Sequence, residues 1–597
     1  MSSVERVKTR EEIDKNFKWD IEKVYATIEQ WEKDFAHLKE NGPKIKEFAG
    51  KLENPEKLLA FFKLSEENSR LLEKLQVFAH MRSHEDTANS DFQALKDKVD
   101  SYAAEYGSYE AYFLPELLSL KEGVIDKALS EVKELEEYKF LLEKILKQKP
   151  HVLSKEQEAL MASVSDCLEA PGNIFSMLSN ADMTFGLVKD EEGKEIELTE
   201  SNYSQFIRSK DRKVREGAFK VLFDTYGKYK NTFAASLTSS TKNFIFKSKI
   251  RKYNSALESS LIPNDIPVEV YNNVIDTVNK NLNSLHRYVK IKKKLLGLSD
   301  IHMYDLYVPV IDTPKEYIPF EEGIDIIREG LEPLGTEYLS IVNEGIENRW
   351  VDIYENKGKR GGAYSWGSYD TMPYILLNYN YQLNDVSTFA HEMGHSVHSY
   401  YSRKNQPYIY ANYTLFCAEV ASTTNEILLI NYLIEKEKDK NKRLYLINQE
   451  LEQIRTTVFR QTMFAEFEKI SHESIEKGEP LTANDLCNIW HELNVKYFGE
   501  EMVVDGEIDM EWARIPHFYS DFYVYQYATG YSAANSFAKM ILEEGQSAVD
   551  KYKVFLKSGG SDYPINTLKA AGVDMTTPKP LEDTIKRFNE LLDMLEV

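Results

Sequence analysis

The sequence contains few cysteines, no long apolar run and no surplus of positive charge. Cys167, Cys417 and Cys487 are widely separated in a chain of 597 residues, which argues against a disulfide framework and is typical of a reducing compartment. No stretch of about 18 apolar residues occurs, so no segment is expected to span a membrane. The charged segment from Met1 to Lys18 lacks the apolar core of a signal peptide. We therefore expect a cytoplasmic protein.

The charge balance is acidic, with 97 Asp and Glu residues against 74 Lys and Arg residues and a net charge of −23. Nucleic acids and anionic membranes are recognised through basic patches, so this balance argues against both as partners. Solubility alone explains it. Hydrophobic residues at 42% and charged residues at 29% describe an ordinary globular protein, and the length is sufficient for several subdomains around a substantial core.

The order of the elements predicts a mainly α fold. From Lys18 to about Pro150, apolar residues recur at helical steps among Glu and Lys. A β-hairpin is expected from Met183 to Leu198, with its turn at Asp190 to Gly193. Helices resume at Ser201. The hairpin therefore predicts a boundary between an N-terminal helical region, residues 1–200, and a catalytic region, residues 201–597.

The segment that carries chemistry reads H-E-x-x-H, formed by His391, Glu392 and His395. Its surroundings predict a helix, because apolar residues recur at three- and four-residue steps. On a helix the two imidazoles project from one face, where they can hold Zn²⁺ at about 2.0–2.1 Å. Glu392 lies about 100° round the helix, where its carboxylate can act on a water at the metal. The apolar positions are Val386, Phe389, Ala390, Met393, Val397 and Tyr400.

A third ligand is needed to complete such a site. One class of zinc peptidase requires glycine and histidine at positions that here hold His398 and Tyr401, so that class is disfavoured. The other class takes a glutamate from a following helix. Glu419 and Glu426 lie seven residues apart on such a helix, among Cys, Ala, Val and Leu, where an unpaired acid is rare. We predict Glu419 as the third ligand.

Two residues beside these ligands have less defined roles. Glu426 is expected either to orient a ligand histidine through a hydrogen bond or to form a buried salt bridge. His398 follows His395 by less than one helical turn, and we expect it to pack or to orient a neighbour. Two imidazoles and one carboxylate leave the metal site with a net charge of +1, which lowers the pKa of a water at the ion toward about 7.

Two further segments are candidates for substrate binding or catalysis. Lys357 to Gly367 and Tyr374 to Tyr379 predict two short strands joined by a loop, with glycines that permit close backbone approach. The stretch from Ile515 to Gly530 carries His517 among several tyrosines, and buried phenols need hydrogen-bond partners. Donors of this kind suit the oxyanion of peptide hydrolysis. The alternative is an amphipathic helix whose aromatic side chains form core.

These motifs, in this order, resemble the thimet oligopeptidase family of zinc peptidases, and most closely its oligoendopeptidase F branch. The resemblance rests on His391 to His395, on Ala418 to Thr423 and on Ile515 to Gly530. It implies a multi-helix ellipsoid with a deep substrate channel, a small β-sheet near the zinc helix, and N-terminal helices that form a channel wall. It also implies one Zn²⁺ per chain and short unstructured peptides as substrates.

The resemblance also implies roles for individual residues. Glu392, His517 and Tyr527 are expected to be catalytic, with Tyr527 favoured over its neighbours as oxyanion donor. Residues 528–532 are similar to a glycine-containing loop of the family beside the substrate. The region before and within the first predicted strand is similar to the family's edge strand, although a sheet that merely packs beneath the metal helix is an alternative. The expected substrate contacts are Gly362, Ala363, Tyr364, Tyr523, Tyr525 and Gly530.

The expected activity is therefore endopeptidase action on oligopeptides through a water that Glu392 activates at the metal. Two alternatives remain: a zinc carboxypeptidase or dipeptidyl carboxypeptidase with the same ligands, and a peptide-binding protein without catalysis. The presence of Glu392 together with three ligands argues against the second. The sequence leaves open the cleavage preference, the oligomeric state and the use of another metal such as cobalt or manganese.

Overall fold

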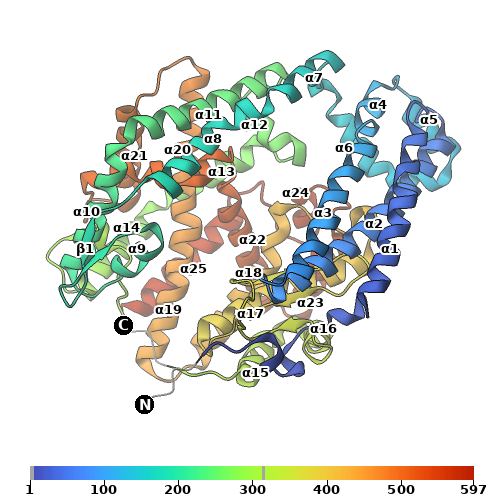
Figure 1. Ribbon diagram of the computed structural model, residues 1–597. Coiled ribbons are helices and arrows are strands. Elements are labelled where there is room, and N and C mark those ends of the chain that lie inside the picture. Colours follow the sequence, from blue (N-terminus) through green and yellow to red (C-terminus); the bar gives the residue numbers. More distant parts are fainter. Residues whose placement is uncertain (1–5, 312–315, 597) are drawn as a thin grey trace. The chain divides into compact units, whose positions relative to one another are not determined.

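The computed structural model describes residues 6–311 and 316–596, which are largely helical (Figure 1). The first five residues of the charged N-terminal segment therefore lie outside the description. The prediction of a mainly α fold with small sheets is confirmed. Within the described ranges, no helix is both long and apolar enough to cross a membrane. All three cysteines are free thiols.

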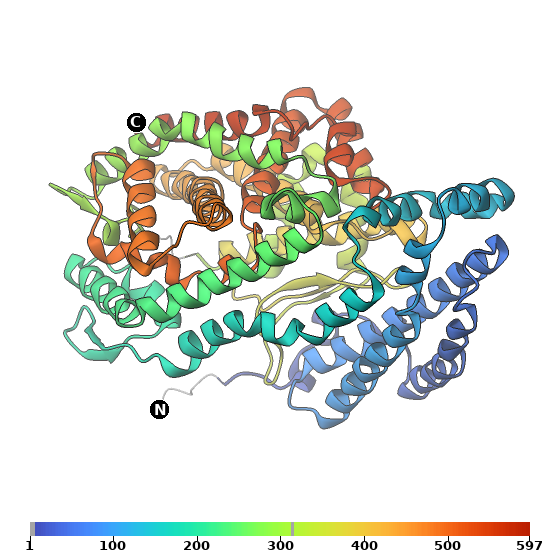
Figure 2. The same ribbon diagram turned by 90° about the horizontal axis from the view of Figure 1, so that it is seen from above.

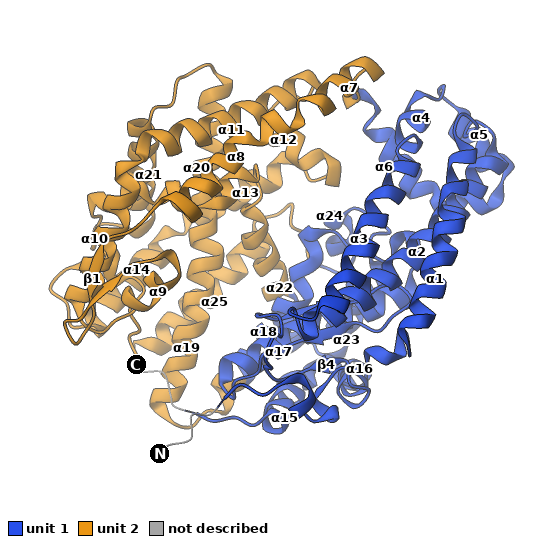
Figure 3. Ribbon diagram, in the orientation of Figure 1, with its two compact units in different colours: residues 1–150, 316–432, 537–572 blue, residues 151–315, 433–536, 573–597 orange. Residues whose placement is uncertain are grey.

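The chain forms two compact units, each assembled from three separate segments (Figure 3). Unit 1 contains residues 1–150, 316–432 and 537–572, and unit 2 contains residues 151–315, 433–536 and 573–597. The N-terminal helices and the H-E-x-x-H helix thus share one unit, and the boundary near residue 200 stays a prediction. Among the described residues, the chain passes between the units twice within α-helices, which are named below.

Unit 1 contains the N-terminal helices, a small sheet and the helices around the H-E-x-x-H motif. Its helices are α1 (Ile28–Asn41), α2 (Pro55–Glu85), α3 (Ser90–Glu110), α4 (Phe113–Ser119), α5 (Val124–Glu131), α6 (Lys139–Lys147), α15 (Phe320–Gly330), α16 (Gly335–Glu347), α17 (Leu383–Asn405), most of α18 (Leu415–Lys436), α23 (Gln546–Ser558) and α24 (Pro564–Ala570). Its strands are β4 (Val351–Asp352), β5 (Tyr364–Trp366) and β6 (Tyr374–Leu376).

Unit 2 is also built of helices, with two small sheets of its own. Its helices are α7 (Lys155–Ser163), α8 (Ser165–Met177), α9 (Glu200–Phe206), α10 (Arg212–Lys228), α11 (Lys230–Ile250), α12 (Ala256–Leu261), α13 (Val268–Lys280), α14 (Leu282–Leu295), α19 (Lys440–Ile454), α20 (Arg460–Glu476), α21 (Ala483–Phe498) and α25 (Lys579–Leu595). Helix α22 (Tyr525–Glu544) begins in unit 2 and ends in unit 1, and α18 passes from unit 1 to unit 2.

Short strands pair within each unit. In unit 2, β1 (Leu187–Lys189) and β2 (Glu195–Glu197) form the predicted antiparallel hairpin, and β3 (Ile301–His302) pairs in parallel with β7 (Met502–Val503). Also in unit 2, α8 lies alongside α11 (Figures 1 and 2), where the Ser236 hydroxyl donates to the Pro171 carbonyl at 2.6 Å.

The sheet of unit 1 has the order β4-β6-β5, with β6 parallel to β4 and antiparallel to β5. The two strands expected from the sequence are β5 and β6. One large apolar cluster joins this sheet to the N-terminal helices: it includes Trp31 and Phe35, whose rings stack at 5.1 Å, and extends to Tyr374 and Leu376 of β6. This shared core explains why residues 1–150 belong to the unit that contains α17.

Candidate metal centre

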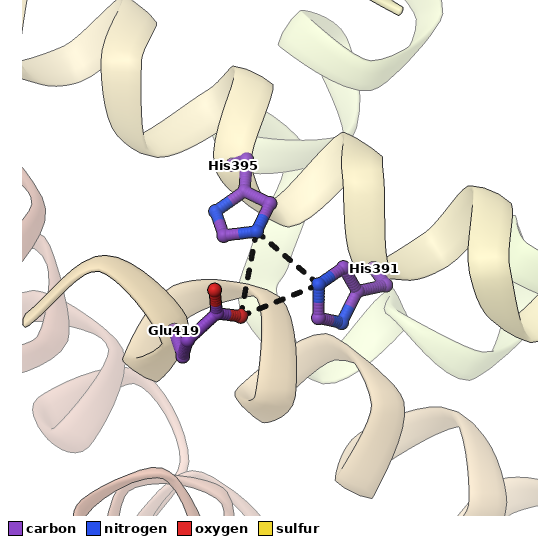
Figure 4. Close-up of side chains that lie close together, drawn as sticks. All are labelled: His391, His395 and Glu419. Carbon is purple, nitrogen blue, oxygen red and sulfur yellow. Dashed lines mark hydrogen bonds and ion pairs between the residues drawn. The ribbon is translucent and has the colours of Figure 1, made fainter. Parts of the chain in front are cut away.

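Three side chains from two helices point their ligand atoms at one place (Figure 4). His391 and His395 lie on α17 with their Nε2 atoms 3.2 Å apart. Glu419 lies on α18, and its Oε2 is 3.4 Å from the Nε2 of His391 and 3.5 Å from that of His395. The Glu419 side chain is 53% exposed, so the site is open to solvent.

These distances fit a tetrahedral metal ion. Ligand atoms at about 2.0–2.1 Å from a tetrahedral centre stand about 3.3–3.4 Å from one another, which is close to the three separations found here. Two imidazole nitrogens and one carboxylate oxygen form a donor set that suits Zn²⁺ and leaves a fourth position for water or substrate. In the described part of the chain no other group of three or more such side chains meets the same test.

Gly394 explains how the third ligand reaches the two histidines. A Cβ atom at this position would lie 2.6 Å from the Cα of Ser422 and 2.9 Å from the carbonyl oxygen of Ala421, both on α18. These are backbone atoms that cannot rotate away. Only glycine therefore permits α17 and α18 to approach this closely, and this approach delivers Glu419 to the histidines.

Hydrogen bonds from α18 orient the ligands. Oε2 of Glu426 lies 3.3 Å from Nδ1 of His391, and the Ser422 hydroxyl donates to the carboxylate of Glu419 at 3.1 Å. Burial of the ring lowers the pKa of His391, but the carboxylates of Glu419 and Glu426 outweigh it and raise the pKa to about 10. Hydrogen bonds from His391 and His395 hold the pKa of the Glu419 carboxyl well below its usual range. The candidate ligands His391 and Glu419 therefore have partners that fix their orientation.

Asn425 joins the two helices one residue before Glu426. Its side-chain amide donates to the carbonyl of Ala390 at 3.0 Å, and its oxygen accepts from the buried Tyr338 hydroxyl at 2.8 Å. Asn425 is fully buried. The backbone immediately before His391 is thereby fixed to α18 through a side chain whose own partner is also buried.

Glu392 is held by the sheet. It is only 8% exposed, and burial raises the pKa of its carboxyl, while the neighbouring imidazoles and the backbone N–H of Ser365 oppose this rise. The hydroxyl of Ser365 also lies 2.8 Å from that of Ser396 on α17. Strand β5 and the metal helix are thus joined twice, and Glu392 accepts a hydrogen bond from the strand.

The backbone of Ser365 lies on the free edge of β5. The N–H groups of Ile375 in β6 and of Leu377 just after it donate to the β4 side of the sheet. The backbone N–H and C=O groups of the alternate residues, Tyr374 and Leu376, therefore face β5. Tyr364 and Trp366 therefore pair with β6, and the backbone groups of Ala363 and Ser365 point away from the sheet. Tyr364 directs its hydroxyl to Nδ1 of His84 at 2.7 Å, which fixes the start of the strand.

A cavity of about 380 Å³ lies beside this edge. Gly362 adopts a φ of +84°, which favours glycine, and its carbonyl accepts from the Asn378 side chain at 2.8 Å. Thr388 lies one helical turn before His391. The cavity is therefore next to both the free strand edge and the metal helix. It is lined by Gly362, Ala363, Leu377, Asn378, Tyr379, Asp385 and Thr388.

In unit 2, three side chains of the predicted histidine–tyrosine segment contact one another. The hydroxyl of Tyr527 lies 3.2 Å from Nε2 of His517. The ring of Tyr523 lies 6.0 Å from that of His517, nearly parallel to it, and 5.5 Å from that of Tyr527. His517 is exposed and both tyrosines are half-buried, so these polar atoms are accessible.

The remainder of this segment differs from the expectation. His517 lies in a 3₁₀ turn, Pro516–Tyr519, and α22 then runs without interruption from Tyr525. Residues 528–532, expected as a loop, are therefore helical, because the buried small residues that follow continue the helix. Tyr525 is 2% exposed and packs against Tyr271, and Gly530 is buried within α22. Both residues thus belong to packed helix.

Comparison with known proteins decides the family. The sequence profile of Peptidase family M3 matches residues 205–587, and the N-terminal profile named Oligopeptidase F matches residues 116–185. The chain belongs to peptidase family M3. It is therefore a peptidase.

Relatives of this M3 peptidase match it over nearly its whole length. It is 49% identical to the oligopeptidase PepF of Bacillus subtilis over 98% of this chain and 88% of that protein. It is 40% identical to the group B oligopeptidase PepB of Streptococcus agalactiae over 98% of each chain.

Solved structures agree in fold. A crystal structure of a Chlamydophila abortus protein has a TM-score of 0.94 at 38% identity, covering 99% of each chain. The oligoendopeptidase-F structure from Enterococcus faecium has a TM-score of 0.73 at 37% identity, covering 95% of this chain and 98% of that one.

Sequence reasoning missed several residues of the M3 peptidase site. Ser365, Ser396 and Asn425 form hydrogen bonds with segments that are distant in the sequence, and no local sequence pattern identifies such contacts. His398 packs as expected: its ring stacks on that of Tyr413 at 3.7 Å, and burial lowers its pKa to about 3. It is therefore a neutral packing residue beside the ligands.

Proposed function

We propose that this M3 peptidase is a zinc-dependent endopeptidase that hydrolyses internal bonds of short unstructured oligopeptides. The convergence of His391, His395 and Glu419 at separations that fit a tetrahedral ion carries the proposal. Relatives named oligopeptidase and oligoendopeptidase support the class of substrate. The three free thiols agree with a cytoplasmic place of action.

The ligands would hold one Zn²⁺ per chain, which when bound supplies a Lewis acid that activates water and polarises the scissile carbonyl. Glu392 performs the proton transfers. Its carboxylate takes a proton from the attacking water and then delivers it to the leaving amine. Its buried position raises the pKa of the carboxyl, which makes the carboxylate a stronger base for the first transfer, and the N–H of Ser365 keeps the carboxylate in place.

Strand β5 offers a binding edge for the peptide. The outward backbone groups of Ala363 and Ser365 are free of β6, so an extended peptide can add to this edge as a further strand. The N–H of Ser365 already donates to Glu392, which leaves Ala363 and the carbonyl of Ser365 for the substrate. Gly362 keeps the approach open, and the cavity beside it can take a side chain.

The remaining catalytic roles fall to the side chains of unit 2. His517 and Tyr527 are proposed to donate hydrogen bonds to the oxyanion of the tetrahedral intermediate, and Tyr523 to contact the substrate. The 3.2 Å contact between the Tyr527 hydroxyl and the His517 imidazole supports a joint action. Tyr525 is excluded from the proposal because its ring is buried.

Substitution of Glu392 tests the mechanism. Glu392→Gln keeps the shape of the side chain but cannot accept the proton, so turnover is expected to fall by about 10²–10⁴-fold while zinc stays bound. Zinc content is measured by mass spectrometry and turnover with a quenched fluorescent peptide. Glu347→Gln, on an exposed position of α16, is the matched control. Undiminished turnover in Glu392→Gln with full zinc content would remove Glu392 from the chemistry.

The products distinguish endopeptidase action from end trimming. A mixed peptide library is digested with and without a chelator and read by mass spectrometry. Internal cleavage that the chelator abolishes is expected, and fragments shortened only from the C-terminus would establish a carboxypeptidase. A folded protein offered beside a short peptide tests the substrate class, because equal cleavage of both would contradict a restriction to oligopeptides.

A further inference from the structure

The loop between His517 and Tyr527 contains a strained residue. Phe522 has a φ of +58°, in the left-handed region that bulky side chains rarely adopt. It follows the 3₁₀ turn of His517 and precedes α22, which carries Tyr527. Such a conformation persists only where surrounding contacts enforce it.

The backbone of Phe522 is held by a buried carboxyl. Its N–H donates to Oε1 of Glu468, on α20, at 3.0 Å, and Glu468 is 2% exposed. Burial raises the pKa of the Glu468 carboxyl well above its usual range. Loss of this acceptor would leave a buried N–H without a partner, which destabilises the loop.

The side chain of Phe522 anchors the same point. The ring is 1% exposed and lies 4.4 Å from that of His472 on α20 and 5.6 Å from that of Tyr271 on α13. Glycine would adopt the same φ without strain but could not fill this space. The packing of the phenylalanine ring therefore offsets the backbone strain at Phe522 and fixes the position of the ring.

The preceding residue is held as well. The carbonyl of Asp521 accepts from the Ser260 hydroxyl at 3.2 Å, and its carboxylate lies 3.2 Å from Nε2 of His472. Nδ1 of His472 donates to the carbonyl of Glu468 at 2.8 Å. Glu468, His472, Asp521 and Phe522 together form what we call the Phe522 clamp, which lies entirely within unit 2.

We propose that the Phe522 clamp positions Tyr523 and Tyr527 against His517. The clamp fixes the backbone between the 3₁₀ turn that carries His517 and the start of α22, which carries Tyr527. The contacts of His517 with Tyr523 and Tyr527 depend on this backbone position. Glu468 and Phe522 are thus positioning residues that act through His517 and Tyr527. This inference rests on the proposed oxyanion role of those two residues for its effect on activity.

Replacement of Glu468 tests the clamp. Glu468→Met removes the acceptor and keeps the volume, whereas Glu468→Gln keeps an acceptor oxygen for the N–H of Phe522. Because a displacement of about 1 Å can lower a rate about 100-fold, we expect kcat of Glu468→Met to fall by about 10- to 100-fold with zinc content unchanged. Glu468→Gln is expected to stay within about twofold of the wild type. In a His517→Ala background, the loss of kcat caused by Glu468→Met is expected to be smaller than in the wild type, because only its effect through Tyr527 remains.

A structural readout separates this inference from the proposed function. The protein has 12 histidines, and the ¹³Cε1–¹H NMR signal of His517 is assigned by its loss in His517→Ala. This signal should shift in Glu468→Met, which displaces the neighbouring tyrosine rings, and stay in place in Glu468→Gln. If Glu468→Met does not fold, Ser260→Ala removes a peripheral contact of the clamp and should shift the signal in the same direction.

The outcomes are distinct. An unmoved His517 signal in Glu468→Met overturns the clamp whatever the kinetics show, and so does a loss of kcat that persists in full in the His517→Ala background. An unchanged kcat in His517→Ala alone removes the oxyanion role of His517, while a shifted signal in Glu468→Met would still establish the clamp.

Discussion

Replacing Gly394 with alanine places a methyl group where the backbone of α18 already lies. The new Cβ atom would stand 2.6 Å from the Cα of Ser422, and an ordinary contact begins at 3.4 Å. Because the opposing atoms are backbone, relief requires α17 and α18 to separate by about 0.8 Å, the difference between these distances. No rotamer change can absorb this overlap.

The separation acts directly on the metal site. Glu419 lies on α18 one turn before Ser422, whereas both histidines lie on α17. Metal–ligand distances tolerate about ±0.2 Å, so a shift of about 0.8 Å takes the carboxylate out of reach. Loss of a ligand-orienting contact alone weakens metal binding by about 10- to 100-fold. We expect Gly394→Ala to weaken zinc binding by at least about 100-fold, or about 2.8 kcal/mol.

Zinc affinity is measured by competition with a chromophoric chelator, and the fold is followed by thermal unfolding of the metal-free protein. Overpacking is expected to lower the free energy of unfolding by about 1–3 kcal/mol. Gly107→Ala on α3 is the matched control, because a Cβ atom there meets no atom within 4 Å and alanine favours the helix. A zinc affinity for Gly394→Ala within about threefold of the wild type would refute the reasoning.

Two further substitutions test the surroundings of the ligands. Glu426→Ala removes the carboxylate beside Nδ1 of His391 and should weaken zinc binding by about 10- to 100-fold in the same chelator assay, whereas Glu347→Ala should not. His398→Phe removes a ring that stays neutral when folded, with a pKa of about 3, but takes up a proton near pH 6.5 when unfolded. The wild type therefore loses about 2 kcal/mol of stability between pH 7 and pH 5 at this residue. Metal-free His398→Phe should lack this loss, and equal shifts in thermal unfolding for both proteins would contradict it.

The sequence predicts those parts of the site that lie close together in the chain. His391, Glu392 and His395 share one helical turn, so their spacing determines their geometry. Glu419 could be predicted as the third ligand because an acid among apolar residues on the next helix needs a partner. The mainly α fold, the hairpin and the short strands follow from patterns of similar local range.

Contacts between distant segments could not be predicted in this way. The hydrogen bond from Ser365 to Glu392 depends on how β5 packs against α17, and the need for glycine at 394 depends on the backbone of α18. The composition of the two units depends likewise on tertiary packing. Tyr525 carries the same local signal as Tyr523 and Tyr527, but its ring is buried and packs against Tyr271.

The three-part composition of unit 1 has a consequence for how the enzyme matures during synthesis. Helix α23 packs on α17, where the ring of Phe555 lies 4.9 Å from that of His398, more than 150 residues earlier in the chain. A nascent chain that has emerged only past His391 and His395 therefore still lacks part of the packing around them. Residues 537–572 must therefore be synthesised before the packing around His391 and His395 in unit 1 is complete.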